Sequence, residues 1–167
     1  LSKVNKRAIY KTYPGRCFID QNPLIQYGKS LPNIKVISER FDFRYVNTIG
    51  DIFILGHLGG ASTIMWMLGL NRPIIYLYTN KFRYLNPSAQ NIVKKALINV
   101  DIDEYDWENN LKNLLNKPHN ELVEMWQEKQ IYRDQFDDEW FMGNNLHAGK
   151  LGAKYINKFI LENTKKN

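Results

Sequence analysis

The predicted fold is decided by the stretch Asp51-Ile-Phe-Ile-Leu-Gly-His-Leu-Gly-Gly-Ala-Ser-Thr63. Its apolar run Ile52 to Leu55 has the length of a buried strand. The glycines that follow let the backbone turn sharply and approach a ligand closely. Ser62 and Thr63 then begin a helix, whose free N–H groups favour an anion. The stretch therefore predicts a strand, a glycine-rich turn and a helix, a unit that often binds phosphate or a nucleotide in α/β proteins.

The flanking residues extend this unit into an alternating pattern. Strands are expected at Ala8 to Tyr10, Ile34 to Ile37, Ile52 to Leu55 and Ile74 to Tyr78. Helices are expected at Asn22 to Tyr27, Phe41 to Ile49, Ser62 to Gly69, and up to about Leu97 from the cap Asn86-Pro87-Ser88. Strands that alternate with helices predict an α/β fold, here a three-layer Rossmann-like domain with a mainly parallel sheet.

The last third of the sequence has a helical character. Amphipathic helices are expected at Asp106 to Leu115, Pro118 to about Tyr132 and Asn145 to Leu161. Their expected buried side chains are Leu111, Leu114, Leu115, Leu122, Val123 and Trp126. On the earlier apolar helix, Trp66 and Met67 are expected in the core. We find no repeat and no interdomain linker, so residues 1–167 are predicted to form a single domain.

Composition and charge limit the classes of function. Lysine and arginine exceed aspartate and glutamate by 23 − 17 = +6, but the basic residues are scattered and their densest run is Lys165-Lys166. This pattern favours an anionic ligand or a weak membrane-surface contact, and it argues against a nucleic-acid partner. Cys17 is the only cysteine, which indicates a reducing, cytoplasmic location, peripheral to the inner face of the membrane if that contact forms. No apolar run approaches the roughly 18–20 residues of a membrane span.

Gly59, Gly60, Ser62 and Thr63 form the best candidate site for a phosphate group. Backbone N–H donors and hydroxyls would face the anion at the carboxyl end of a parallel strand. The alternative interpretation is a tight strand–helix turn with an ordinary N-cap. The pattern is neither a Walker loop nor GxGxxG, because no Gly-Lys-Ser/Thr follows and the glycine spacing differs.

Three further side chains could join this site. Lys11 and Arg16 follow the first strand and would place two cations at the same sheet edge, unless they belong to a solvated basic loop. His57 lies beside the glycines and could donate to phosphate or transfer a proton, although a structural role is the alternative. Lys81, Arg83 and Tyr84 follow a neighbouring strand and favour a solvated loop. The wide spacing of His57, His119 and His147 offers no metal pattern, and neither a metal nor a cofactor is expected.

Four segments resemble the C-terminal half of the GT-B glycosyltransferases that build bacterial surface polysaccharide, including the glycerophosphotransferases of teichoic acid synthesis. These are Tyr10-Lys11-Thr-Tyr-Pro14-Gly-Arg16, Ile34-Lys-Val-Ile37, the stretch from Asp51 to Thr63, and Pro73-Ile-Ile-Tyr76. In that family a Lys/Arg-x-His-Pro turn ends one strand, and here Tyr13 stands where histidine is common. The resemblance covers roughly residues 8 to 85 and implies that Ser62 and Thr63 contact the phosphate or sugar of a nucleotide-linked donor.

The same resemblance implies a partner for the chain. The family uses a second Rossmann-like domain that supplies the acceptor site and often the catalytic base, and the first strand of its C-terminal half has no counterpart here. We therefore expect a donor-binding domain, truncated at its N-terminus, that lacks transferase turnover without a second GT-B domain or partner chain. Two alternatives stay open: a non-catalytic nucleotide- or glycan-binding module, and one half of a nucleotide-sugar epimerase.

Overall fold

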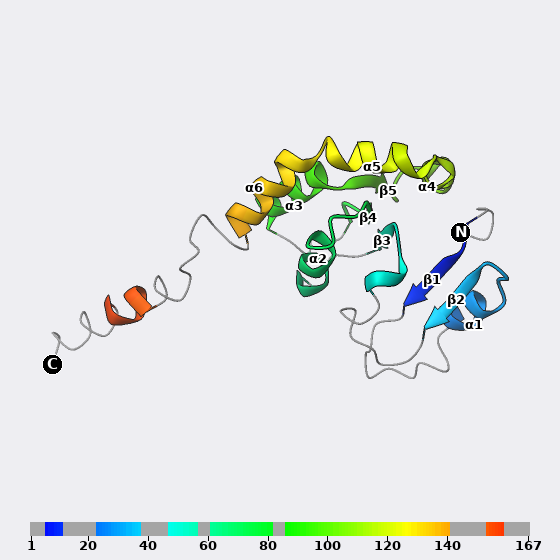
Figure 1. Cartoon of the computed structure of the whole chain (residues 1–167), viewed down its shortest axis with the longest axis horizontal. Coiled ribbons are helices and arrows are strands. Elements are labelled where there is room, and N and C mark those ends of the chain that lie inside the picture. Colours follow the sequence, from blue (N-terminus) through cyan, green and yellow to red (C-terminus); the bar gives the residue numbers. More distant parts are fainter. Residues whose placement is uncertain are drawn as a thin grey trace.

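The chain folds as an α/β protein with two parallel β-sheets, as seen in a computed structural model (Figure 1). The structure describes residues 6–11, 23–37, 47–56, 61–81, 86–140 and 153–158. Its strands are β1 (Ala8–Lys11), β2 (Ile34–Ile37), β3 (Phe53–Leu55), β4 (Ile74–Tyr78) and β5 (Ile98–Asp101). Its helices are α1 (Pro23–Lys29), η3 (Asn47–Ile49), α2 (Ala61–Leu68), α3 (Pro87–Ala96), α4 (Trp107–Asn116), α5 (His119–Gln127) and α6 (Gln130–Trp140). Residues 153–158 are also helical.

Both sheets are wholly parallel within the described residues. The smaller one pairs β1 with β2, in the register Ala8 to Ile34. The larger one has the order β3-β4-β5, with Phe53 opposite Ile74 and Ile75 opposite Ile98. Parallel neighbours need a crossover connection, and the helices α1, α2 and α3 supply one for each successive pair.

The core is built around β4 and β5. Ile74 and Ile75 are fully buried, and the apolar run of β4 is typical of a parallel strand covered on both faces. Helix α3 turns Ile92 and Val93 into this core. Its first turn is capped by Asn86, whose Oδ1 accepts a hydrogen bond of 3.0 Å from the backbone N–H of Ser88.

The helices after β5 form a connected layer in which α6 packs along α3 (Figure 1). Arg133 of α6 is buried and its guanidinium lies 3.6 Å from the ring centre of Trp126. It donates to the backbone carbonyls of Trp126 and Ala96, at the ends of α5 and α3. A cation at two helix carboxyl ends is electrostatically favourable. Burial nevertheless lowers the pKa of Arg133 to about 10.

Most predicted elements are confirmed. Strands Ile34–Ile37 and Ile74–Tyr78 have the predicted bounds, and so does the cap of α3 at Asn86. Helices α1, α2, α3 and α4 lie within two residues of their predicted ends. Only Asn47–Ile49 of the helix expected from Phe41 is described, as a 3-10 turn. The structure confirms parallel sheets with helices, and three layers on one sheet stay a prediction.

Two predictions are wrong, and one strand was not predicted. Strand β5 was not predicted, because Ile98-Asn-Val-Asp101 is short and directly follows a helix without a turn residue. The helix expected from Pro118 to Tyr132 is divided into α5 and α6 at Glu128 and Lys129. The carbonyl of Trp126 accepts there from the N–H of Lys129 and from Arg133, so the helical ladder ends. Trp66 is half exposed rather than part of the core, although Met67 is buried as predicted.

The expected buried side chains of the helical third are largely correct. Leu111, Leu115, Leu122 and Trp126 are buried, Leu114 is partly buried against the core, and Val123 is partly buried. Of the last expected helix, from Asn145 to Leu161, the described residues 153–158 are helical. In this short stretch Tyr155 and Ile156 are exposed.

Candidate functional site

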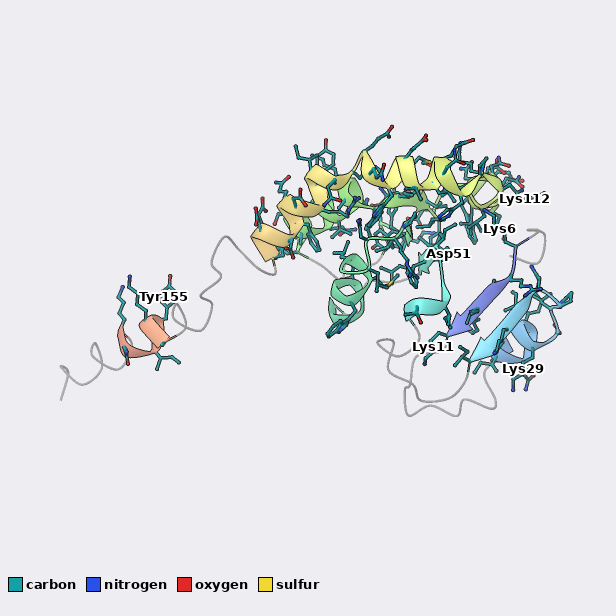
Figure 2. The ribbon with its side chains drawn as sticks, in the orientation of Figure 1. Lys6, Lys11, Lys29, Asp51, Lys112 and Tyr155 are labelled. Atoms are coloured by element: carbon teal, nitrogen blue, oxygen red, sulfur yellow. The ribbon has the colours of Figure 1, made fainter. Side chains whose placement is uncertain are left out.

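The predicted phosphate site lies where β1 and β3 end. Lys11 is the last residue of β1, and its label marks that end of the strand in Figure 2. Strand β3 ends at Leu55, and α2 begins six residues later at Ala61. Ser62 and Thr63 belong to the first turn of α2, but their side chains lie outside the described part of the structure. Arg16, His57, Gly59 and Gly60 also lie outside it, so their predicted roles stay predictions.

The order of the strands gives this edge a particular character. From β1 the chain proceeds to β2, and from β3 it proceeds to β4 and then β5. In Figure 1, β1 is drawn between β2 and β3, and the two sheets are separate, with no ladder joining β1 to β3 within the described residues. Open α/β sheets bind ligands outside the carboxyl ends of their strands. Lys11 and Leu55 are the last residues of β1 and β3 and mark that end of each strand.

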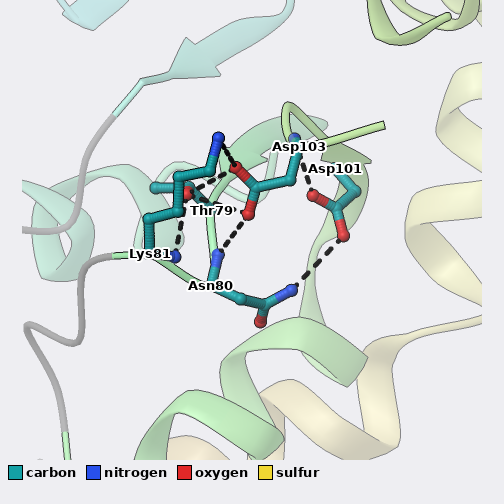
Figure 3. Close-up of polar contacts among 5 residues, drawn as sticks. All are labelled: Thr79, Asn80, Lys81, Asp101 and Asp103. Atoms are coloured by element: carbon teal, nitrogen blue, oxygen red, sulfur yellow. Dashed lines mark hydrogen bonds and ion pairs between the residues drawn. The ribbon is translucent and has the colours of Figure 1, made fainter. Parts of the chain in front are cut away.

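A second polar group lies at the carboxyl ends of β4 and β5, and we call it the Asp103 clasp (Figure 3). The clasp consists of Thr79, Asn80, Lys81, Asp101 and Asp103. The carboxylate of Asp103 accepts from the Thr79 hydroxyl at 2.9 and 3.0 Å and from the backbone N–H of Asn80 at 2.8 Å. The ammonium of Lys81 lies 3.3 Å from the same carboxylate. Asp101 accepts at 2.9 Å from the N–H of Asp103.

These hydrogen bonds and the ion pair stabilise the ionised form of Asp103. Hydrogen bonds from Asn80, Thr79 and Lys81 favour the carboxylate, and together they lower the pKa of Asp103 below its usual value despite some desolvation. The carboxylate therefore stays charged through the neutral range and is poorly suited to act as a proton donor. Its role in the described structure is to tie the segment after β4 to the segment after β5.

Lys94 and Tyr78 lie beside the clasp. The ammonium of Lys94 donates to the Asn80 side chain at 2.9 Å and lies 3.9 Å from the centre of the Tyr78 ring. Burial, a hydrogen bond with Asp101 and the nearby carboxylates raise the pKa of Tyr78 to about 12. The Tyr78 hydroxyl is thus protonated at neutral pH, so it is available as a donor and not as a base.

The clasp was not predicted from the sequence, apart from the position of Lys81. The available signal was the pair of polar runs, Thr79-Asn-Lys81 and Asp101-Ile-Asp103, which end two strands that are neighbours in the sheet. That signal could be used only once β5 was recognised as a strand. Lys81 is exposed, in agreement with the expected solvated loop, and it also forms an ion pair with Asp103, while Arg83 and Tyr84 lie outside the described residues.

Other predicted features have limited support in the structure. His119 is the first residue of α5 and is exposed, as expected, and His147 lies outside the described residues. Within the described ranges, no three histidine, cysteine, aspartate or glutamate side chains gather closely enough to hold a metal ion. None of the helices described combines the length and the apolar character that a membrane span requires.

The chain matches no family model, no curated protein and no solved structure.

Proposed function

We propose that the chain is the donor-binding domain of a nucleotide-sugar or nucleotide-alditol transferase that acts in surface polysaccharide synthesis. In this proposal the parallel strands belong to a Rossmann-like domain with helices on both faces. The observation that carries it is the parallel pairing of β1 with β2 and of β3 with β4, in which a helix connects each strand to the next. Lys11 is the last residue of β1, and α2 begins six residues after the end of β3; α/β proteins bind nucleotides at the carboxyl ends of their strands.

The chemistry of this edge suits an anionic leaving group. The first N–H groups of a helix have no partner within the helix and its amino end carries a partial positive charge, so the beginning of α2 at Ala61 suits an anion. Lys11 adds a full positive charge at the end of β1. During transfer, charge develops on the departing nucleoside phosphate, and fixed donors at that point stabilise it. The base that activates the acceptor hydroxyl would come from the second domain that the GT-B resemblance implies.

A non-catalytic module that binds a nucleotide or an anionic glycan is the second candidate. It is favoured by the Asp103 clasp, because the carboxylates described at the edge of β4 and β5 are occupied by hydrogen bonds and an ion pair. A transferase needs a general base somewhere, and neither Asp103 nor Tyr78 has a pKa suited to that task. Turnover with a donor and an acceptor distinguishes the two candidates.

The test is a thermal-shift panel of UDP-, CDP-, CMP- and GDP-linked donors, followed by calorimetric titration of the best ligand. Binding to the folded state raises the apparent stability by mass action. The double variant Ser62→Ala and Thr63→Ala should lose about 1–3 kcal/mol of binding free energy if hydrogen bonds to phosphate are removed.

The matched control is Ser30→Ala, which removes a hydroxyl that bonds to the Tyr27 carbonyl at the end of α1. It should leave the affinity unchanged. If the double variant is folded and binds as tightly as the unchanged chain, the turn before α2 is not the donor site. If no donor in the panel binds, the proposed function itself is rejected.

A further inference from the structure

The outward side of α6 carries exposed acidic side chains. Arg133 and Phe136 are buried, and the helix packs along α3. Because an α-helix has about 3.6 residues per turn, Ile131, Asp134 and Asp138 lie together on the opposite side. All three are exposed, and the exposed fraction of Ile131 is 71%. We call these three residues the α6 face.

The carboxylates of α6 form no ion pair within the described part of the chain, where the ion pairs lie on other elements. Asp134 and Glu139 accept hydrogen bonds from glutamine side chains of the same helix, at 2.6 and 2.8 Å. Asp137, Asp138 and Glu139 lie in the last turn, where negative charge opposes the helix dipole. Electrostatics within the helix therefore do not account for these acidic residues, and a cationic partner would offset their charge.

The small sheet has one face covered by α1. A Cβ on Gly28 of α1 would lie 2.9 Å from the side chain of Val36 and 3.8 Å from that of Tyr10. Val36 and Tyr10 are neighbours in the register of β1 and β2, so α1 packs on the face that carries them. Because the side chains of a strand alternate between its two faces, Ile9 and its cross-strand neighbour Lys35 lie on the other face.

That other face of the small sheet is cationic. Ile9 is 42% exposed, Lys35 is exposed, and so is Arg7, which directly precedes β1. We call Arg7, Ile9 and Lys35 the β1–β2 face. The charged residues of the described ranges 6–11 and 23–37 are all basic, so no carboxylate of these ranges balances them. This face thus attracts an acidic partner.

The α6 face and the β1–β2 face match in size as well as in charge. Each has one exposed isoleucine and two charges of a single sign. On α6 the two aspartates lie about 5 and 11 Å along the helix from Ile131. On the small sheet the two cations lie about 5 and 7 Å from Ile9, across and along the strands. Long lysine and arginine side chains bridge such differences, so the two faces can make two ion pairs around one apolar contact.

We propose that the chain self-associates, and that the α6 face of one copy binds the β1–β2 face of a second copy. The two aspartates pair with Arg7 and Lys35, and Ile131 packs against Ile9. A single exposed ion pair contributes little, so the two pairs and the apolar contact act together. The net charge of +6 makes two copies repel each other in most orientations. The complementary faces select the orientation in which opposite charges meet.

The proposed contact joins two different surfaces of the chain. A dimer therefore forms it twice by symmetry, and a larger ring forms it once at each junction. Self-association of this kind needs no nucleotide and does not rest on the proposed function. The quantity to measure is the mass of the particle and its dependence on protein concentration and salt.

Analytical ultracentrifugation of the whole chain measures the association. At about 50 mM salt the average mass should rise with protein concentration, and at about 500 mM salt it should fall towards that of the monomer, because salt screens exposed charges. Reversal of the acidic face with Asp134→Lys and Asp138→Lys should raise the dissociation constant at least about tenfold. Lysine near the carboxyl end of a helix suits the helix dipole, so this variant should fold.

Two further pairs of substitutions guard the interpretation. The control Glu104→Lys with Glu108→Lys changes the net charge by the same amount at exposed residues near the start of α4, and it should change the dissociation constant far less. Arg7→Glu with Lys35→Glu reverses the basic face and should weaken association as the α6 variant does. A mixture of the two reversed variants should associate again, because each supplies the face that the other has lost.

If the chain with Arg7→Glu and Lys35→Glu fails to fold, crosslinking of the unchanged chain decides. Carbodiimide joins a lysine amine to a carboxylate as an amide, without a spacer. Mixing copies of normal and heavy isotopes distinguishes links between copies from links within one copy. Mass spectrometry should find Lys35 joined to Asp134 or Asp138 of the other copy.

Several results would overturn the proposal. A monomer at every concentration in low salt would exclude self-association. An association that persists in high salt, or that the control weakens as much as the α6 reversal, would mean that charge on these faces does not carry it. A mixture of the reversed variants that stays monomeric, or crosslinks from Lys35 to other carboxylates alone, would mean that the two faces are not each other's partners.

Discussion

The two sheets of this protein differ in how deeply their strands are buried and in the polar contacts described at the strand ends. In the larger sheet, with α3 to α6 around it, β4 and β5 are buried and the end of each strand is tied down by the Asp103 clasp. In the smaller one, β1 and β2 have α1 as their neighbour, and both strands are partly exposed along their length. The comparison teaches that the proposed ligand edge is divided: the ends of β4 and β5 belong to the more deeply buried sheet, whereas Lys11 at the end of β1 belongs to the less buried one.

The segments around β1 and β2 also differ from α6 in the sign of their charges. The charged side chains of the described residues 6–11 and 23–37 are all basic, whereas α6 carries Asp134, Asp137, Asp138 and Glu139. Acidic residues in the last turn of a helix oppose its dipole and give no stability there. The stability of α6 must therefore come from packing, through Phe136 and Arg133 against α3 and α5. The basic residues around β1 and β2, in turn, suit an anionic partner.

The largest expected effect tests the buried unit. Trp126 is 1% exposed, and its ring is stacked under the Arg133 guanidinium. Trp126→Ala should lower the free energy of unfolding by about 3–5 kcal/mol, because it removes a large buried ring. Urea titration followed by circular dichroism measures this loss. The control Trp140→Ala, at a tryptophan that is 40% exposed, should cost far less. Equal losses would mean that Trp126 is not the centre of the helical layer.

The next effect tests the smaller unit on its own. A Cβ on Gly28 of α1 would lie 2.9 Å from a methyl group of Val36 on β2. Gly28→Ala should therefore destabilise the chain by about 1–3 kcal/mol through overpacking, despite the gain in helix propensity. Gly56→Ala is the control, because among the described residues its Cβ would meet no atom within 4 Å apart from its chain neighbours.

Hydrogen exchange decides where the Gly28→Ala damage is located. If the two units are stabilised separately, exchange should accelerate in β1 and β2 and stay slow in β4 and β5. Faster exchange throughout the chain would show that the two sheets unfold as one cooperative body. That outcome would mean that the two sheets are not stabilised separately.

The sequence predicted the elements whose signals are local. Ile34–Ile37 and Ile74–Tyr78 are apolar runs bounded by turn residues, and the cap at Asn86 is a local pattern as well. β5 was missed because its stability comes from pairing with β4 and not from its own composition. The exposure of Trp66 was missed because nearly every side chain of α2 is apolar, so the outward face of that helix carries no polar mark.

For the candidate site, as for the fold, the sequence predicted only what depends on local signals. The ends of β1 and β3 were identified from strand and turn signals, and the structure has both strands. The Asp103 clasp joins residues more than twenty positions apart, so it follows from sheet order and not from any local pattern. The predicted contacts of Ser62, Thr63 and His57 with a donor stay predictions.

A smaller effect tests the connection between the core and the loops at the ligand edge. Asn86→Ala removes the bond from the Ser88 N–H to the Asn86 side chain at the start of α3. The expected loss is about 1 kcal/mol in the free energy of unfolding, as for other N-cap residues. Asp106→Ala is the control, since Asp106 precedes α4 without a side-chain cap bond. A loss at Asp106 as large as that at Asn86 would mean that the cap bond is not the stabilising feature.

The smallest effect at neutral pH concerns Tyr78, next to the clasp. Its pKa is raised from 10.0 to about 12, first by burial and then by the hydrogen bond and charge of Asp101. The folded state therefore holds the proton more tightly than the unfolded state. This contribution to stability is complete below pH 10 and is lost as the pH rises towards 12. Between those limits the unchanged chain should lose stability more steeply than Tyr78→Phe, which has no proton to release.

Urea titrations of both chains at pH 9 and at pH 11 measure the difference in slope. A second variant, Asp101→Asn, identifies the cause. It removes a negative charge beside the Tyr78 hydroxyl, so the pKa of Tyr78 should fall towards 10 and its absorbance change near 295 nm should begin at lower pH. Parallel pH profiles for the unchanged chain and Tyr78→Phe would contradict this account. In that case neither burial nor Asp101 would hold the proton of Tyr78, and the clasp would not distinguish the larger sheet from the smaller one.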